Sequence, residues 1–136
     1  RFGDPETQAV LPRLKSDLVD VMLAAVEGRL AGMKLSWDPR PCVCVVMAAG
    51  GYPGDYATGK VVTGLDQASL GAVVFHAGTR RDGGAVVTSG GRVLGVTALG
   101  SDIAGAIRNV YAEAGKISFD GAQYRRDIGK KALNRS

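Results

Sequence analysis

An arginine and two carboxylates crowd the first six residues. Arg1, Asp4 and Glu6 lie on a segment that Gly3 turns and Pro5 stiffens. A guanidinium offers a rigid fork of donors to carboxylate or phosphate oxygens, and neighbouring carboxylates can orient an amine or hold the arginine. The spacing alone favours solvated loop charges over a binding site.

A glycine-rich loop follows an apolar run and contains Gly51, Tyr52 and Gly54. Its backbone N–H groups can surround an anion. The loop lacks the Lys-Ser/Thr ending of a P-loop and the spacing of a dinucleotide fingerprint. A turn that simply ends a strand is therefore the more economical interpretation.

Two later segments pair glycines with a polar side chain. His76, the sole histidine, precedes Gly78 and Thr79 and suits a proton carrier or an anion donor, although such a histidine is more often a structural donor. Gly91 and Arg92 fit a phosphate site and a hairpin equally well. The segment 124–129 joins a tyrosine to charges and is typical of a packed terminus with an Arg–Asp pair.

Cys42 and Cys44 are the only cysteines and stand two residues apart. In a strand they share a face with poor geometry for a mutual disulfide. Two cysteines and one histidine do not complete a four-ligand zinc site, and no metal site is predicted. We expect small buried hydrophobic side chains in a reducing compartment.

The chain has 136 residues, 46% hydrophobic and 22% charged, which fits one globular domain. No apolar run approaches the roughly 20 residues that span a bilayer, so no membrane partner is expected. The chain opens without a signal peptide or an initiating methionine, and we expect a processed chain or a fragment. The net charge of +4 resides in the last twelve residues, because the first 124 hold 12 basic and 12 acidic groups. That balance disfavours nucleic acid as a partner and favours a solvated basic tail.

Hydrophobic spacing predicts the elements that position these residues. Residues 1–10 should form a loop, and an apolar stripe predicts a helix over 13–30, with Ser16 or Asp17 as an inner cap and a break at 36–41. The run 42–48 suits a central strand. Further strands are expected at 61–63, 72–75, 85–88 and 92–99, with hairpin connections at 81–84 and 89–91. A second helix should cover 102–115, with Asp102 in its first turn.

Six ordered blocks resemble one family, the phosphoribosylamine–glycine ligases, also called glycinamide ribonucleotide synthetases. They are Arg-Phe-Gly-Asp-Pro-Glu-Thr-Gln at 1–8 and the segments at 11–18, 50–56, 76–79, 90–97 and 124–129. The resemblance covers nearly the whole chain and matches the C-terminal third of the family. It implies an α+β fold, in which the end of an ATP-grasp domain (loop plus helix, 1–36) precedes a small β-rich, single-hybrid-like C-terminal domain with one packed helix (37–130) and a basic tail (131–136).

The resemblance further implies an ATP-dependent ligase of purine synthesis in the cytoplasm. The family joins glycine to 5-phosphoribosylamine, and ATP becomes ADP and phosphate while glycyl phosphate forms. ATP and Mg²⁺ would bind in the full-length enzyme. The metal ligands and the nucleotide site would lie upstream of residue 1, in the remainder of the ligase, so no cofactor is expected on this chain and the chain alone should be inactive.

The carried-over roles follow the matching motifs. Arg1 would be catalytic at the acyl-phosphate centre, and the other matched residues would bind substrate: Asp4, Glu6, Gly51, Tyr52, Gly54, His76, Gly78, Thr79, Gly91 and Arg92. The alternative to a ligase fragment is a stand-alone β-rich binding or interaction module without catalysis.

Overall fold

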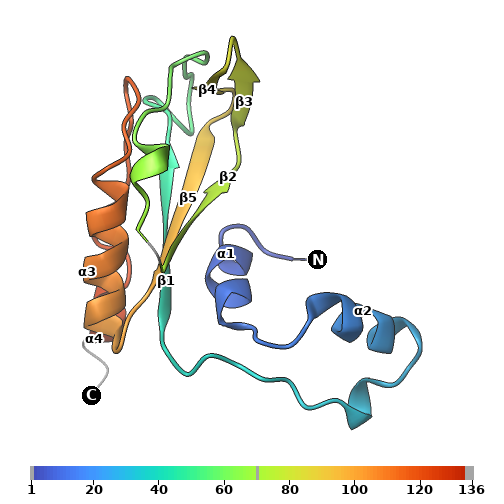
Figure 1. Ribbon diagram of the computed structural model, residues 1–136. Coiled ribbons are helices and arrows are strands. Elements are labelled where there is room, and N and C mark those ends of the chain that lie inside the picture. The colour runs from blue at the N-terminus through green and yellow to red at the C-terminus, as the bar shows by residue number, and fades with distance from the viewer. Residues whose placement is uncertain (1, 70, 134–136) are drawn as a thin grey trace.

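Two antiparallel sheets and one long helix form the centre of the molecule, which a computed structural model describes for residues 2–69 and 71–133 (Figure 1). The α-helices are α1 (Glu6–Val10), α2 (Leu18–Val26), α3 (Ile103–Ala114) and α4 (Lys130–Leu133). The strands are β1 (Cys42–Ala48), β2 (Ala72–His76), β3 (Thr79–Asp82), β4 (Ala85–Thr88) and β5 (Arg92–Leu99). The α+β class expected from the sequence is confirmed.

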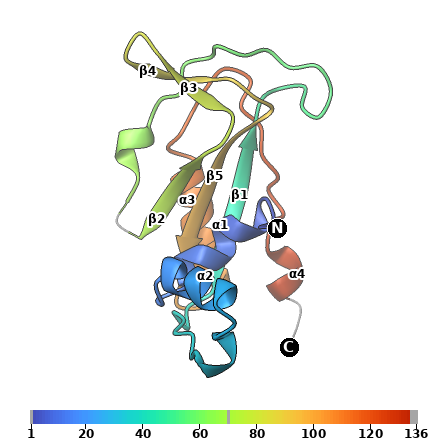
Figure 2. The same cartoon turned by 90° about the vertical axis from the view of Figure 1, so that its right-hand side faces the viewer.

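The larger sheet has the order β1-β5-β2, and helices lie on both of its faces. β5 is central and pairs antiparallel with β1 (Val45 opposite Val96) and with β2 (Val74 opposite Val96). α3 packs against one face, and α1 contacts β1 and β5 from the other (Figures 1 and 2). The strand predicted at 42–48 is confirmed in its bounds, but it lies at an edge of this sheet rather than at its centre.

The core fills the space between the sheet and α3. Alternate residues of β1 face it, and they meet the buried side of α3. The fully buried side chains include Met47, Val45, Leu94, Val96 and Val110. Asp102 caps α3 by accepting a hydrogen bond from the Gly105 N–H (2.6 Å). The helix predicted over 102–115 is therefore confirmed.

The opposite face of the sheet contacts α1. Gly95 lies in the middle of β5, and a Cβ there would meet the Gln8 side chain of α1 at 3.7 Å. The Cys44 Sγ (3.5 Å) and the Phe75 Cβ (3.8 Å) flank the same position. These are ordinary van der Waals distances, so the short helix lies close to the strand at Gly95 without requiring a glycine there. The loop predicted for residues 1–10 holds for residues 2–5 but is wrong for Glu6–Val10, which form α1.

The second sheet is a hairpin of β3 and β4. Its two-residue loop, Gly83 and Gly84, has φ of +52° and +86°, as the primed hairpin turns require. The predicted turn at 81–84 is thus confirmed, although its first two residues belong to β3, which was missed. The predicted hairpin at 89–91 is wrong, because β4 pairs with β3 and β5 pairs in the other sheet. Residues 61–63 make isolated bridges and not a strand.

The segment between α1 and β1 departs most from prediction. The expected helix over 13–30 shrinks to α2, because Pro12 lies in a separate 3₁₀ turn and Leu14 bridges Trp37. Lys15 N–H donates to the Ser36 carbonyl (2.9 Å), which keeps the chain extended before Asp17 caps the helix. Gly28, at φ +71°, follows its end. The predicted inner start at Asp17 is confirmed.

Candidate functional site

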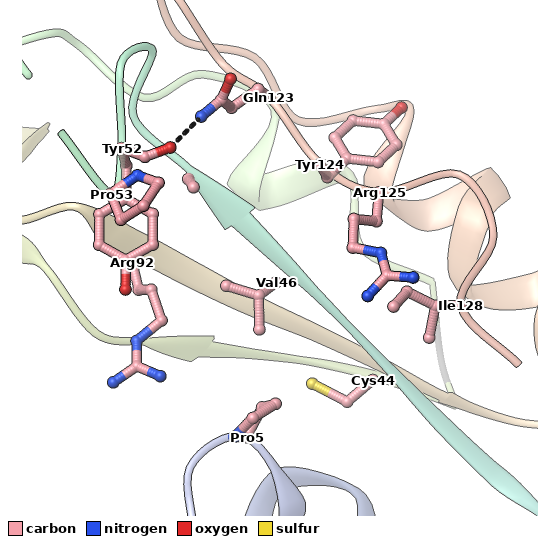
Figure 3. Close-up of a pocket in the computed structure, with 11 residues that line it drawn as sticks. Pro5, Cys44, Val46, Tyr52, Pro53, Arg92, Gln123, Tyr124, Arg125 and Ile128 are labelled. Carbon is pink, nitrogen blue, oxygen red and sulfur yellow. Dashed lines mark hydrogen bonds between the residues drawn. The ribbon is translucent and has the colours of Figure 1, made fainter.

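A cavity of about 650 Å³ lies on the face of the sheet that α1 contacts (Figure 3). Its floor is the outward side of β1, where Cys44, Val46 and Ala48 alternate with the core residues. Three other segments form its walls, and together with Pro5 they contribute Tyr52, Pro53, Arg92, Gln123, Tyr124, Arg125 and Ile128. The cavity therefore has an apolar base and a polar rim.

Arg92, the first residue of β5, forms an ion pair with the N-terminal segment. Its Nη2 lies 3.0 Å from the Asp4 Oδ2, and its Nη1 donates to the Asp4 carbonyl at 3.4 Å. Both side chains are about half exposed. This contact spans 88 positions of sequence and brings two separately predicted motifs to one site.

The Tyr52–Pro53 wall is built on close backbone packing. A Cβ on Gly91 would collide with the Tyr52 ring, so the ring lies directly against the backbone before Arg92. Gly51 has φ +95°, and a side chain there would collide with the Asp55 carbonyl. These two glycines, predicted to bind substrate, shape the wall rather than line the cavity.

The C-terminal segment closes the other side. Arg125 pairs with Asp127 (Nη2 to Oδ2, 2.6 Å), and this guanidinium lowers the pKa of Asp127 below its usual value. The predicted Arg–Asp pair is confirmed. Sequence reasoning missed that Gln123, Tyr124 and Arg125 line a cavity, although the block at 124–129 was already a recognised motif.

The electrostatic character of the rim comes from two guanidinium groups. Arg92 and Arg125 lie on opposite sides of β1 (Figure 3). Each is held by one carboxylate and retains N–H groups that those contacts do not use. An apolar floor between two such groups suits an organic ligand with an anionic end.

The remaining predicted site residues do not all reach this cavity. His76 and Thr79 line a separate hollow of about 310 Å³ beside the β3–β4 hairpin, where the His76 Nδ1 lies 2.9 Å from the Thr79 Oγ1. Gly78 lets two chain segments cross, since a Cβ there would lie 2.6 Å from the Gly90 Cα. Glu6 and Gly54 line neither hollow. Arg1 lies outside the described residues.

The two cysteines are free and share the outward face of β1. They are half-buried rather than fully buried, because alternate residues of β1 face the cavity side while the others enter the core. Burial raises the pKa of both thiols, which keeps them protonated near neutral pH. Within residues 2–69 and 71–133, no three His, Cys, Asp or Glu side chains are grouped as a metal site.

The chain matches the family described as phosphoribosylglycinamide synthetase, C domain, over residues 42–131. It belongs to that family. The matched range begins where β1 begins and includes the sheet, α3 and the C-terminal wall of the cavity.

Similar proteins carry the family's ligase name. The phosphoribosylamine–glycine ligase of Vibrio cholerae is 53% identical over 136 residues, and that of Synechocystis is 56% identical over 135. These alignments cover 99% and 98% of this chain but 32% of each relative. The chain thus spans about a third of the length of these relatives.

A solved structure shares the fold. The crystal structure of phosphoribosylamine–glycine ligase from Thermotoga maritima aligns with a TM-score of 0.71 at 35% identity, covering 93% of this chain and 31% of that one. The similarity therefore extends beyond the family's C domain into the N-terminal segment. No helix among the described residues is long and apolar enough to cross a membrane.

Proposed function

We propose that this chain is the C-terminal part of a phosphoribosylamine–glycine ligase. The whole enzyme would join glycine to 5-phosphoribosylamine, form glycinamide ribonucleotide through glycyl phosphate, and convert ATP to ADP and phosphate. The observation that carries the proposal is the 53% identity over 136 residues to the Vibrio cholerae ligase. Similarity along the full chain does not favour a stand-alone binding module.

The cavity is the proposed site for the sugar phosphate. Its two guanidinium groups, Arg92 and Arg125, suit the phosphate, and the apolar surface of Val46 and Ala48 suits the carbon face of a ribose. Asp4 accepts from Arg92 through Oδ2 and from Gln8 through Oδ1 (3.4 Å), so its carboxylate is held at the same rim, where it would orient an amine. Arg1, three residues earlier in the chain, remains the proposed catalytic group.

The hollow at His76 has a separate proposed role. Gly78 backbone N–H donates to the Arg92 carbonyl at 2.7 Å, so this segment contacts the beginning of β5. His76 and Thr79 would then extend the substrate enclosure past the cavity in the assembled enzyme. ATP and Mg²⁺ are assigned to the upstream part of the ligase, where the resemblance puts the nucleotide site and the metal ligands.

Residues 1–36 are the proposed end of an ATP-grasp domain, and 37–130 the single-hybrid-like domain. Exposed apolar side chains on α2 support this division: Val19 is 62% exposed, Leu23 51% and Val26 88%. A helix with this much apolar surface needs a partner, and relatives three times as long supply the chain to provide one. We infer that α2 packs into the domain that precedes it.

A chimaeric ligase tests the proposal. The first two-thirds of the Vibrio cholerae enzyme followed by residues 1–136 should form glycinamide ribonucleotide from glycine, 5-phosphoribosylamine and ATP, measured by mass spectrometry of the product. In that enzyme Arg92→Ala should raise the KM for the amine at least tenfold, because one of two phosphate-facing groups is lost. That change corresponds to roughly 1.4 kcal/mol or more.

Arg108→Ala is the matched control, since Arg108 is an exposed arginine on α3 outside the cavity. Its KM should stay within twofold of the parent. A well-folded chimaera that makes no product would contradict the ligase assignment and favour a binding module. Equal effects of the two arginine substitutions would remove the cavity from the sugar-phosphate site.

A further inference from the structure

We propose that Gln123 is a positioning residue that sets the width of the cavity between the Tyr52–Pro53 wall and the Arg125 wall. This inference rests on the proposed function, since it concerns the same ligand site. The polar contacts of the Gln123 side chain are with the protein's own backbone, and the new claim is that these contacts determine how strongly the ligand binds.

The Gln123 carboxamide contacts two carbonyl groups that precede it in the chain by 71 and 74 positions. Its Nε2 donates to the Tyr52 carbonyl at 3.0 Å (Figure 3) and to the Ala49 carbonyl at 3.1 Å. An amide nitrogen has two hydrogens, and each has one acceptor here. The side chain therefore grips both ends of the turn that carries Tyr52.

The backbone of Gln123 is fixed as firmly as its side chain. Its N–H donates to the Ala48 carbonyl (2.9 Å), and its carbonyl accepts from the Ala48 N–H (2.8 Å). This antiparallel bridge anchors the residue to the end of β1, which is the floor of the cavity. The carboxamide therefore holds the Tyr52 loop in a fixed position relative to the end of β1.

Tyr111 anchors the far end of the same wall. Its hydroxyl donates to the Arg125 carbonyl (2.8 Å) and accepts from the Ile128 N–H (3.0 Å). Because Tyr111 lies on α3, which packs against the core, these two hydrogen bonds fix the Arg125 segment relative to the core. Gln123 is then the side-chain tie between this fixed wall and the glycine-rich turn opposite.

The consequence is preorganisation of the ligand site. Arg92 follows Gly91, against which the Tyr52 ring packs, so movement of the Tyr52 turn alters the surroundings of Arg92. Two guanidinium groups bind one phosphate well only at a fixed separation. Loss of the carboxamide tie should weaken ligand binding without removing any group that contacts the ligand through charge.

The test compares Gln123→Glu with the parent in the chimaeric ligase, by calorimetric titration with glycinamide ribonucleotide. The substituted carboxylate keeps the shape but points oxygens at two carbonyl oxygens, so both hydrogen bonds are lost. We expect the Kd to rise at least tenfold at pH 8, while the Kd for ATP stays within twofold. The difference in product Kd between Gln123→Glu and the parent should shrink as the pH falls, because a protonated carboxyl regains one hydrogen-bond donor.

Gln67→Glu is the matched control, because Gln67 is exposed at the end of the 3₁₀ helix Leu65–Gln67, outside the cavity, and its substitution should leave both Kd values within twofold. Unchanged product binding by Gln123→Glu would overturn the inference and leave the ligase assignment intact. A parent that fails to bind the product would overturn both. Gln123→Met removes both hydrogen bonds without adding a charge, so it must also weaken product binding about threefold or more, whether or not Gln123→Glu folds. A parent-like Kd for Gln123→Met would refute the positioning role.

Discussion

Residues 42–128 and residues 2–41 both form capped helices, but only the first region has a buried core. The first region holds the sheet, α3 and nearly all buried side chains, whereas among the described residues of 2–41 only Ala24 and Asp38 are buried. Yet α2 has an Asp cap and an apolar sequence, as α3 does. The difference is that α3 has a sheet to cover and α2 does not.

That contrast shows which region can fold without further chain. A nine-residue helix such as α2 is marginal in water, because packing supplies most helix stability in proteins. The sheet and α3 bury Met47, Val96 and Val110 completely and constitute a core of their own. We expect residues 42–128 to unfold as one cooperative unit and α2 to contribute little to it in the isolated 136-residue chain.

Two methionines, one in each region, give the largest expected effect. Met47 is 0% exposed in the core, and Met22 on α2 is 42% exposed. Met47→Ala should lower the free energy of unfolding by about 2–5 kcal/mol, since it leaves a cavity, whereas Met22→Ala should stay within about 0.5 kcal/mol. Urea unfolding of the 136-residue chain, followed by circular dichroism, measures both.

The same two substitutions test the proposed packing of α2 against a preceding domain. In the chimaeric ligase Met22→Ala should become destabilising, because the apolar side of α2 would then be buried. A large effect of Met22→Ala in the isolated chain would mean that α2 already belongs to the cooperative unit. An equally small effect in both settings would argue against α2 as an interface with the preceding domain.

The elements with a complete local pattern were predictable from sequence. β1 has a continuous apolar run, α3 has helical spacing with a cap, and Gly83-Gly84 specifies a tight turn. The helix predicted over 13–30 is too long. Its apolar stripe includes residues before Asp17, where hydrogen bonds to the Ser36 carbonyl hold the chain in an extended conformation. β3 was missed because Arg80, Arg81 and Asp82 have no apolar alternation, and only its pairing with β4 makes it a strand.

The candidate site shows the same limit at longer range. Asp4, Tyr52 and Arg92 were each singled out; Tyr52 and Arg92 line one cavity, and Asp4 pairs with Arg92 at its rim. His76 and Thr79 were grouped with them by motif order, but the fold turns them to a different hollow. Gln123 escaped notice because its importance lies in two carbonyl partners more than 70 positions away, and no local spacing encodes such a contact.

Glu113 supplies an intermediate effect within the packed region, and it depends on pH. Lys116 (2.8 Å) and the Ser69 N–H (2.9 Å) donate to its carboxylate, first the ammonium and then the backbone group lowering its pKa from 4.5 to about 2. Because the folded pKa is depressed, the stabilisation is complete above about pH 4.5 and is lost as the pH falls toward 2. Glu113→Gln should cost about 1.5 kcal/mol at pH 7.

Urea unfolding from pH 7 to pH 2 separates this carboxylate from others that titrate in the same range. The gap between the parent and Glu113→Gln should shrink steadily below pH 4.5. Asp20→Asn, at an exposed position of α2, is the control and should run parallel to the parent. A gap that stays constant with pH would mean that the lost contacts are not ionic.

Two helix caps give the smallest effect and the sharpest comparison of the regions. The Asp102 Oδ1 accepts from Gly105 N–H (2.6 Å) on α3, and the Asp17 Oδ1 accepts from Val19 N–H (2.7 Å) on α2. Each cap contributes about 1 kcal/mol to its own helix.

Asp102→Ala should therefore lower the global free energy of unfolding by about 1 kcal/mol, because α3 unfolds with the sheet. Asp17→Ala should leave it unchanged and speed amide hydrogen exchange in α2 alone, since a helix outside the cooperative unit loses its cap without cost to the core. Equal global losses for the two substitutions would show that the two regions fold as one, and would end the distinction on which the interface assignment of α2 depends.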